Sequence, residues 1–313
     1  MKVAILDDVH RAYEGTAGVR RLRARAEVRI FTAPFGDPVA LAGFDALVAN
    51  RERTKFTREL FAALPDLRII AQTGNHAYHI DLAAAEARGI VVAKASGGFS
   101  YGAAELAIGL AMALMRRIPA ADRAVRHGAW QTPLTHILHR KTLGVVGFGH
   151  VGRHVAKIAQ ALEMRVLAWS PRLTDEAART SGVERRKLDD LLCESDVVSV
   201  HATLTPESRG LLDARRLAMM KPTAYLINTA RGPIVDEAAL VAALGSRRIA
   251  GAGLDVFDEE PLPAGHPLTA LDNVILTPHI GWPTDEAYES FAGAAADVLT
   301  AYLDGRDVPR FRS

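Results

Sequence analysis

The sequence predicts an α/β protein of two doubly wound parallel-sheet domains, and three observations support this. Apolar runs of strand length alternate with helical stretches along nearly the whole chain. Near the middle, a G-x-G-x-x-G phrase at Gly147, Gly149 and Gly152 stands between one such run and a helix. The chain has 313 residues, which is long for a single hydrophobic core, so two domains are the natural expectation.

The composition is that of a globular protein, with 49% hydrophobic and 24% charged residues. A formal net charge of +2 is too small to predict a nucleic-acid or membrane partner. The single cysteine, Cys193, excludes an intramolecular disulfide and fits a reducing compartment. The chain opens on a strand-like MKVAILDD without the features of a signal peptide. We therefore expect a cytoplasmic protein that binds neither nucleic acid nor membrane.

The first part of the chain alternates strands and helices. Strand-length apolar runs lie at residues 3–6, 28–31, 46–49, 69–71 and 90–93. Helical stretches lie between them, at residues 19–25, 37–41, 57–64 and 82–88. This order predicts a parallel sheet covered by helices. Polar loops follow two of the strands, at residues 50–54 and 72–76, where such sheets bind ligands, although an ordinary surface loop explains each equally well.

Residues 142–170 read as a βαβ unit of about 30 residues. The first glycine of its turn permits the tight bend, the second lets the backbone approach a pyrophosphate, and the third allows close packing of helix and strand. The helix N-terminus adds free N–H groups and a positive dipole end. The glycine phrase alone also fits an ordinary βα turn, but its frame of strand and helix favours dinucleotide binding.

The rest of the chain continues the same pattern. An alanine- and leucine-rich helix precedes the βαβ unit at residues 100–117, and a last helix spans residues 284–303. Further strands are expected at residues 197–200, 224–228, 249–254 and 274–276. A late helix commonly returns to the first domain in two-part proteins of this kind. We therefore expect a discontinuous domain of residues 1–98 plus 285–313, and a dinucleotide-binding domain of residues 99–284.

Three side chains at expected strand ends suit the reduction of a 2-keto acid: Arg231, Glu260 and His279. A guanidinium holds a carboxylate bidentately and polarises a carbonyl, and a histidine donates a proton near neutral pH. A carboxylate beside that histidine stabilises its protonated form. Each residue also has a structural explanation, as a helix cap, a solvated acid and a loop histidine. Their coincidence after a dinucleotide motif favours the catalytic interpretation.

Longer phrases then give a specific resemblance over nearly the whole chain. They are LGVVGFGHVG, SDVVSVHATLTPESRGLL, the segment from MMKPTAYLINTARG to VDEAAL, AGAGLDVFDEEPLP and LTPHIG. With these phrases the sequence resembles the D-isomer-specific 2-hydroxyacid dehydrogenases, the family of D-3-phosphoglycerate dehydrogenase and glyoxylate/hydroxypyruvate reductase. The resemblance implies a Rossmann-type cofactor domain, a flavodoxin-like substrate domain, an active site in the cleft between them, and a homodimer.

The resemblance also implies site residues. The catalytic trio falls on Arg231, Glu260 and His279. The implied cofactor contacts are Gly147, Gly149, His150, Val151, Gly152, Ser170, Arg172, His201, Thr229, Ala230, Asp255 and Gly281. The implied substrate contacts are Arg51, Gly74, Asn75 and Arg231, with Arg53 on the same side. No metal ligand is implied.

Two departures from the family pattern bear on specificity. The loop at residues 74–81 is longer than in phosphoglycerate dehydrogenase-like members, which argues against phosphoglycerate as the substrate. An NAD enzyme usually carries Asp where this chain has Ser170, and Arg172 follows close behind. We therefore expect NAD or NADP as the cofactor, with a weak preference for NADP.

The sequence thus predicts an NAD(P)-dependent dehydrogenase that reversibly reduces a small 2-keto acid, of the glyoxylate or hydroxypyruvate type, to the D-2-hydroxy acid. Two alternatives stay open. One is a D-3-phosphoglycerate dehydrogenase, and the other is a dinucleotide-sensing protein of the corepressor type on the same fold. Oxidation of NAD(P)H with glyoxylate or hydroxypyruvate separates an enzyme from a sensor.

Overall fold

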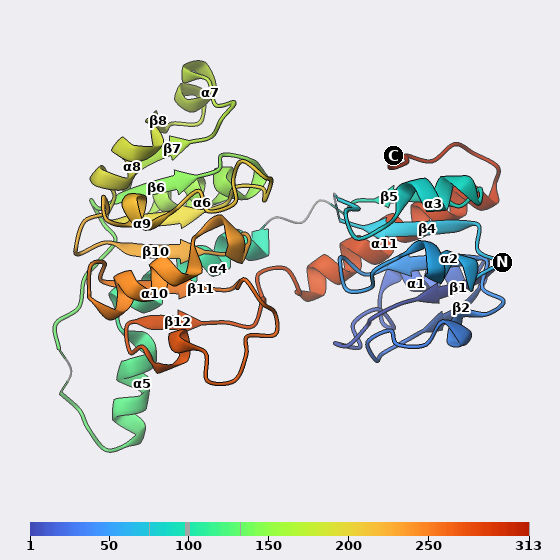
Figure 1. Ribbon diagram of the computed structural model, residues 1–313, viewed down its shortest axis with the longest axis horizontal. Coiled ribbons are helices and arrows are strands. Elements are labelled where there is room, and N and C mark those ends of the chain that lie inside the picture. Colours follow the sequence, from blue (N-terminus) through green and yellow to red (C-terminus); the bar gives the residue numbers. More distant parts are fainter. Residues whose placement is uncertain (75, 98–100, 132, 313) are drawn as a thin grey trace. The chain divides into compact units, whose positions relative to one another are not determined.

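The computed structural model describes residues 1–74, 76–97, 101–131 and 133–312. The chain divides into two compact units: Met1–Phe99 with Pro283–Ser313 (unit 1), and Ser100–Trp282 (unit 2). In Figure 1 each unit is a central sheet with helices packed around it. All strand pairs in both sheets are parallel, so the predicted fold class is confirmed.

Unit 1 contains a five-stranded sheet in the order β2-β1-β3-β4-β5. Its strands are β1 Lys2–Ile5, β2 Glu27–Ile30, β3 Ala46–Ala49, β4 Ile69–Thr73 and β5 Val91–Ala95. Its helices are α1 Ala17–Arg23, α2 Arg58–Ala62, α3 Leu82–Ala87 and α11 Asp285–Leu303, with a short 3₁₀ turn, η1, at Pro38–Leu41. The strands β3 and β4 are buried along their whole length, as expected of central strands covered on both faces.

The last helix of the chain, α11, belongs to the core of unit 1. A Cβ added at Gly18 in α1 would lie 2.2 Å from the carbonyl carbon of Ala292 in α11, so the two backbones are in direct contact. The Glu289 carboxylate accepts a hydrogen bond of 2.9 Å from the Ala17 N–H at the start of α1. The helix also packs against β4 and β5. Residues from the two ends of the chain therefore share one core.

Unit 2 contains a seven-stranded sheet in the order β12-β11-β10-β9-β6-β7-β8. Its strands are β6 Thr142–Val146, β7 Arg165–Trp169, β8 Glu184–Arg185, β9 Val197–Val200, β10 Tyr225–Asn228, β11 Gly251–Leu254 and β12 Val274–Leu276. Its helices are α4 Tyr101–Met115, α5 Ile118–Arg126, α6 His150–Ala161, α7 Asp175–Thr180, α8 Leu188–Glu194, α9 Ala214–Leu217 and α10 Glu237–Gly245, with 3₁₀ turns η2 Gly232–Ile234 and η3 Pro267–Ala270. The direction of the crossovers reverses between β6 and β9, which is where such sheets bind ligands.

Strand β8 and helix α5 were not predicted from the sequence, for physical reasons. Strand β8 is only two residues long and exposed, so it has no apolar pattern. The helix expected at residues 100–117 ends at Met115, and a second helix, α5, begins at Ile118. Arg117 turns the chain with a left-handed φ of 52°, and Pro119 stands in the first turn of α5, where its missing N–H costs no hydrogen bond.

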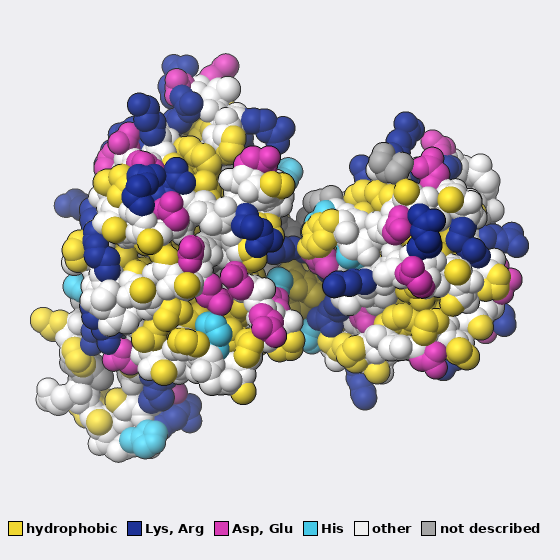
Figure 2. Space-filling model, viewed as in Figure 1, with side chains coloured by type: hydrophobic (Ala, Val, Ile, Leu, Met, Phe, Trp, Pro, Cys, Tyr) yellow, Lys and Arg dark blue, Asp and Glu magenta, His cyan; other side chains and the backbone are white. Residues whose placement is uncertain are grey.

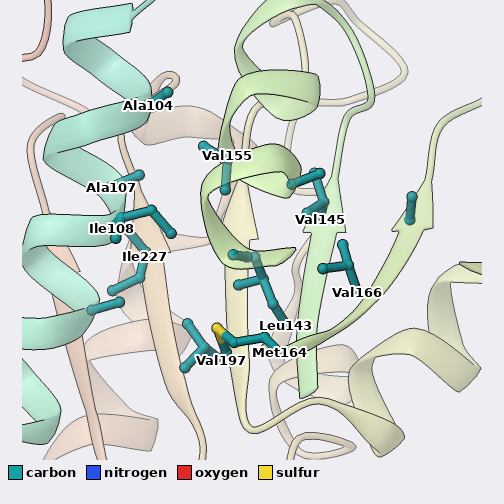
Figure 3. Close-up of a cluster of buried hydrophobic side chains, with 14 of the residues drawn as sticks. Ala104, Ala107, Ile108, Leu143, Val145, Val155, Met164, Val166, Val197 and Ile227 are labelled. Carbon is teal, nitrogen blue, oxygen red and sulfur yellow. The ribbon is translucent and has the colours of Figure 1, made fainter. Parts of the chain in front are cut away.

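The core of unit 2 joins helices α4 and α6 to the sheet. Figure 3 shows Ala104, Ala107 and Ile108 of α4 facing the same cluster as Val155 of α6. Strand residues such as Val145 complete it from the sheet. The small residues of α4 allow this helix to pack closely on α6, β10 and β11. The strand β6, which leads into the glycine turn, is therefore anchored in a packed core.

The surface carries both signs of charge. Figure 2 shows Lys and Arg side chains interspersed with Asp and Glu over the visible face of each unit. Within the described residues, every helix is too short or too polar to pass through a lipid bilayer.

Candidate active site

The glycine turn after β6 has the shape that a bound pyrophosphate needs. Gly147 has a φ of +99°, and a Cβ there would lie 2.4 Å from the Ala202 N, so a side chain is excluded. A Cβ at Gly152 would lie 2.2 Å from the Gly147 O, because α6 starts against the turn. A Cβ at Gly149, in contrast, would meet nothing within 4 Å. The space beside Gly149 is thus the place where a phosphate can reach the backbone.

The N-terminus of α6 opens onto this space. Gly149 is the N-cap, and no side chain of the described residues caps the helix there. His150 and Val151 form its first turn, with His150 exposed. The unbonded N–H groups and the dipole of this helix therefore suit an anion.

Two further expected cofactor residues lie on neighbouring strand ends. His201 follows β9, and its N–H donates to the Val146 O at 2.7 Å, directly beside the glycine turn. Burial lowers the pKa of His201 to about 3, so its ring is neutral. Thr229 follows β10, and its Oγ1 is buried without a hydrogen-bond partner among the described residues. A polar group of a ligand would satisfy this hydroxyl, so the site fits a dinucleotide.

The end of β7 also lies at the turn. The Gly147 N–H donates to the Trp169 O at 2.8 Å, which brings the segment from Ser170 to Arg172 alongside. Ser170 is half-buried, and Arg172 is exposed. The position where many NAD-binding proteins place a carboxylate thus holds a hydroxyl with a cation nearby.

Arg231 is positioned by the end of β10. Asn228 is buried, its Nδ2 donates to the Arg231 O at 3.0 Å, and its Oδ1 accepts from the Ala230 N–H at 3.1 Å. A Cβ added at Gly232 would lie 2.1 Å from the carbonyl carbon of Phe257, so the loop after β10 touches the loop after β11. This contact brings the Arg231 segment next to the segment of Glu260.

Asp255 holds the segment that carries His279. Its fully buried carboxylate accepts hydrogen bonds from the Thr277 Oγ1 at 2.5 Å, the Ile280 N–H at 2.8 Å and the Gly281 N–H at 2.9 Å. Burial raises the pKa of Asp255, and the three hydrogen bonds oppose this rise. Because two of the donors directly follow His279, the carboxylate fixes the backbone there.

His279 and Glu260 form a pair. The Nδ1 of His279 lies 2.7 Å from the Oε2 of Glu260, and the Oε1 of Glu260 accepts from the Phe257 N–H at 3.0 Å. His279 has a φ of +55°, an uncommon conformation for a residue with a side chain. Since Nδ1 faces the carboxylate, Nε2 is the ring nitrogen that can face a substrate.

The electrostatics of the pair keep Glu260 ionised. Burial raises the pKa of Glu260, but the hydrogen bond and the charge of His279 lower it, together with the Phe257 N–H and the charge of Arg231. The balance is a pKa below the usual value for glutamate. The structure thus brings Arg231, Glu260 and His279 together in unit 2.

The expected substrate contacts of unit 1 lie on adjacent loops. Arg51 follows β3, and its N–H donates to the Thr73 Oγ1 at 3.0 Å. Gly74 follows β4 with a φ of +99°, and a Cβ there would lie 3.1 Å from the Nη1 of Arg51. Arg53 is exposed near His10, with 3.3 Å between its Nη2 and the His10 Nε2. Asn75 lies outside the described residues.

Two residues that hold the site were not found from the sequence: Asn228 and Thr277. Both stand inside phrases that were noted, INTARG and LTPHIG, so their position was visible but their partners were not. A polar residue at or just after the end of a strand, within two residues of a candidate site residue, is the signal that would have identified them. Among the described residues, no group of His, Cys, Asp and Glu side chains is arranged to hold a metal ion.

Known proteins match this chain in sequence. A glyoxylate reductase of Thermofilum pendens is 43% identical over 262 residues, which are 82% of this chain and 77% of that protein. A D-3-phosphoglycerate dehydrogenase of Archaeoglobus fulgidus is 44% identical over 267 residues, which are 85% of this chain. The match spans only 50% of that longer protein.

Known structures and a family model agree with these matches. A crystal structure described as a putative D-3-phosphoglycerate dehydrogenase from Ralstonia solanacearum superposes with a TM-score of 0.89 at 37% identity, covering 98% of this chain and 95% of that one. Residues 108–281 match the model of the D-isomer specific 2-hydroxyacid dehydrogenase NAD-binding domain. With the glycine turn and the strand-end residues of unit 2 in place, the chain belongs to the D-isomer-specific 2-hydroxyacid dehydrogenase family.

Proposed function

We propose that the protein reduces a small 2-keto acid of the glyoxylate or hydroxypyruvate type to the D-2-hydroxy acid, and catalyses the reverse reaction. The observation that carries the proposal is the 2.7 Å contact between His279 Nδ1 and Glu260 Oε2, next to the charge of Arg231. Such a set combines a proton donor, a carboxylate that stabilises its protonated form, and a cation for an α-keto carboxylate.

A nicotinamide dinucleotide supplies the hydride when it is bound. The turn at Gly147, Gly149 and Gly152 and the first turn of α6 hold its phosphates. The hydroxyl of Thr229 and the backbone near Ala230 are proposed to meet the nicotinamide end, with Asp255, His201 and Gly281 around them.

The acid–base step follows from the orientation of the imidazole. His279 donates the proton on Nε2 to the carbonyl oxygen as the carbonyl carbon accepts the hydride, and it takes the proton back in the reverse reaction. Glu260, whose pKa is held low, stays ionised at neutral pH and favours the protonated ring. Arg231 binds the substrate carboxylate and polarises the carbonyl. Arg51 and Gly74 are proposed substrate contacts in unit 1.

Two other functions share this fold. A sensor of the corepressor type needs only the glycine turn to bind the dinucleotide, whereas the Glu260–His279 pair is suited to proton transfer, so the pair favours turnover. A D-3-phosphoglycerate dehydrogenase uses the same chemistry on a phosphorylated acid.

We place the reaction in the cytoplasm, where the free thiol of Cys193 stays reduced, and cell fractionation tests this location.

Replacing the proton donor tests the proposal. We predict that His279→Ala lowers kcat with hydroxypyruvate by a factor on the order of 10²–10⁴, the usual weight of a positioned acid. His139→Ala is the matched control, because His139 precedes β6 and so lies at the amino ends of the strands, away from the candidate site at their carboxyl ends. Steady-state oxidation of NAD(P)H measures both variants. A near-normal kcat in the purified His279 variant would contradict the assignment.

Replacing Glu260 tests its role as a partner. In Glu260→Gln the negative charge beside His279 is gone, so the protonated imidazole loses stabilisation. We predict that keto-acid reduction, which needs that proton, declines at a lower pH than in the wild type. The pH dependence of kcat/KM is the measurement, with the exposed neighbour Glu259→Gln as the control. Superimposable profiles for Glu260→Gln and the wild type would remove Glu260 from the mechanism.

The cofactor preference is proposed to lean weakly towards NADP. The half-buried Ser170 can donate to a 2′-phosphate, and the exposed Arg172 can pair with it. We predict that Arg172→Ala raises the KM for NADPH by about 3- to 10-fold, as expected for one exposed charge-assisted hydrogen bond, and leaves the KM for NADH nearly unchanged. Arg179→Ala, on the exposed side of α7, is the control. Equal effects on the KM for NADPH and for NADH would show that Arg172 does not bind the 2′-phosphate.

The protein is proposed to be a homodimer built on unit 2. Helix α5 buries none of its residues, and the segment after it exposes Trp130 (84%), Leu134 (96%) and Ile137 (59%). Apolar side chains exposed to this extent usually mark an interaction surface. We predict that sedimentation gives about twice the chain mass of 33.7 kDa, and that Trp130→Ser with Leu134→Ser shifts it towards the monomer. Val39→Ser, at an exposed apolar site of unit 1, is the control, and a wild-type monomer at micromolar concentration would contradict the proposal.

A further inference from the structure

The loop after β3 contains a carboxylate beside a proposed substrate-binding arginine. Glu52 stands between Arg51 and Arg53, and its side chain is only 22% exposed. Its Oε2 lies 3.4 Å from the Nε of Arg51. Its Oε1 accepts a hydrogen bond from the hydroxyl of Tyr78 at 3.0 Å and is also bonded to the Nε2 of His76. The carboxylate of Glu52 is therefore half-buried and bonded to neighbouring side chains, and it is not surrounded by solvent.

The residues that hold Glu52 come from the loop after β4. The rings of His76 and Tyr78 stack with their centroids 4.8 Å apart and an interplanar angle of 3°. The fully buried Gln72 ties this loop to the loop after β3, because its Nε2 donates to the Arg51 O at 3.2 Å and to the His76 O at 3.3 Å. The loop after β4 thus supplies the partners that fix the carboxylate.

The position of Glu52 affects any anion that Arg51 binds. The guanidinium of Arg51 lies against the turn at Gly74 on one side, where a Cβ would be 3.1 Å from its Nη1. On another side it contacts the Glu52 carboxylate. An anion drawn to Arg51 is therefore repelled by Glu52, and this repulsion grows with the charge of the anion. A phosphate monoester carries close to two negative charges at neutral pH, whereas a hydroxyl carries none and can donate to a carboxylate.

We propose that Glu52 is a specificity-determining residue. It selects 2-keto acids whose end distal to the keto acid group is uncharged, a hydrogen or a hydroxyl, and rejects those that carry a phosphate. The inference rests on the proposed function, since it assumes that Arg231 binds the substrate carboxylate and that Arg51 meets the end of the substrate distal to it. It adds the class of acid that the site prefers and the residue that sets this preference.

Neutral and charged replacements of Glu52 test the inference. The quantity to measure is the ratio of kcat/KM for 3-phosphohydroxypyruvate to that for hydroxypyruvate. We expect a ratio below one in the wild type and a rise of about tenfold or more in Glu52→Gln, since a like charge next to a bound anion is removed. Glu52→Asp keeps the charge and should keep the ratio low. Glu27→Gln is the matched control, because Glu27 is the first residue of β2 and so lies at the amino ends of the strands, whereas Glu52 lies at their carboxyl ends.

Several results would overturn the inference. They are a wild type that prefers the phosphorylated acid, an unchanged ratio in Glu52→Gln, and an equal rise in Glu52→Gln and Glu52→Asp, which would point to loop geometry instead of charge. Glu52→Ser serves as a second neutral variant if circular dichroism shows that glutamine disturbs the fold, and it should raise the ratio as well. Failure of the wild type to reduce either acid would contradict the proposed function itself, which separates the two claims.

Discussion

The candidate active site depends on one buried carboxylate, that of Asp255. A carboxylate with no exposed surface is costly to bury unless hydrogen bonds replace its water, and three donors do so here. Two of these donors are the backbone N–H groups of Ile280 and Gly281. They fix the chain immediately after His279, which adopts a left-handed conformation that is rare for a residue with a side chain. The imidazole is thereby placed with its Nδ1 2.7 Å from the Oε2 of Glu260.

The parallel sheet explains why the other parts of the site lie nearby. The strands β9, β10, β11 and β12 are parallel, so their carboxyl ends lie at the same end of the sheet. The glycine turn after β6 lies at that end as well. Hydrogen bonds join these ends into a row: the Asp255 N–H donates to the Asn228 O at 3.0 Å, and the Asn228 side chain holds the backbone of Ala230 and Arg231. Residues far apart in the sequence thus become neighbours through the strands that precede them. Sites built on such rigid elements keep their geometry.

Much of this arrangement could be predicted from the sequence because it depends on local patterns. Apolar runs predicted most strands, and the glycine phrase predicted the turn at Gly147. The hydrogen-bond partners could not be predicted, since the pairing of Asp255 with Thr277 depends on strand register. Helix α5 was missed because a proline that ends one helix can also start the next. In the sequence Glu52 is one residue of a polar loop after a strand, and only the path of the loop after β4 reveals what holds it.

The configuration of the product tests the central claim most directly. The claim is that His279, fixed through Asp255 and paired with Glu260, protonates the carbonyl oxygen of a small 2-keto acid while a bound nicotinamide dinucleotide delivers hydride to one face of the carbonyl carbon. The measurement is turnover of hydroxypyruvate by the wild-type protein with NADPH or NADH, followed by chiral separation of the glycerate formed. The account predicts D-glycerate alone. L-glycerate, or tight binding of the dinucleotide without turnover of any 2-keto acid, would contradict it.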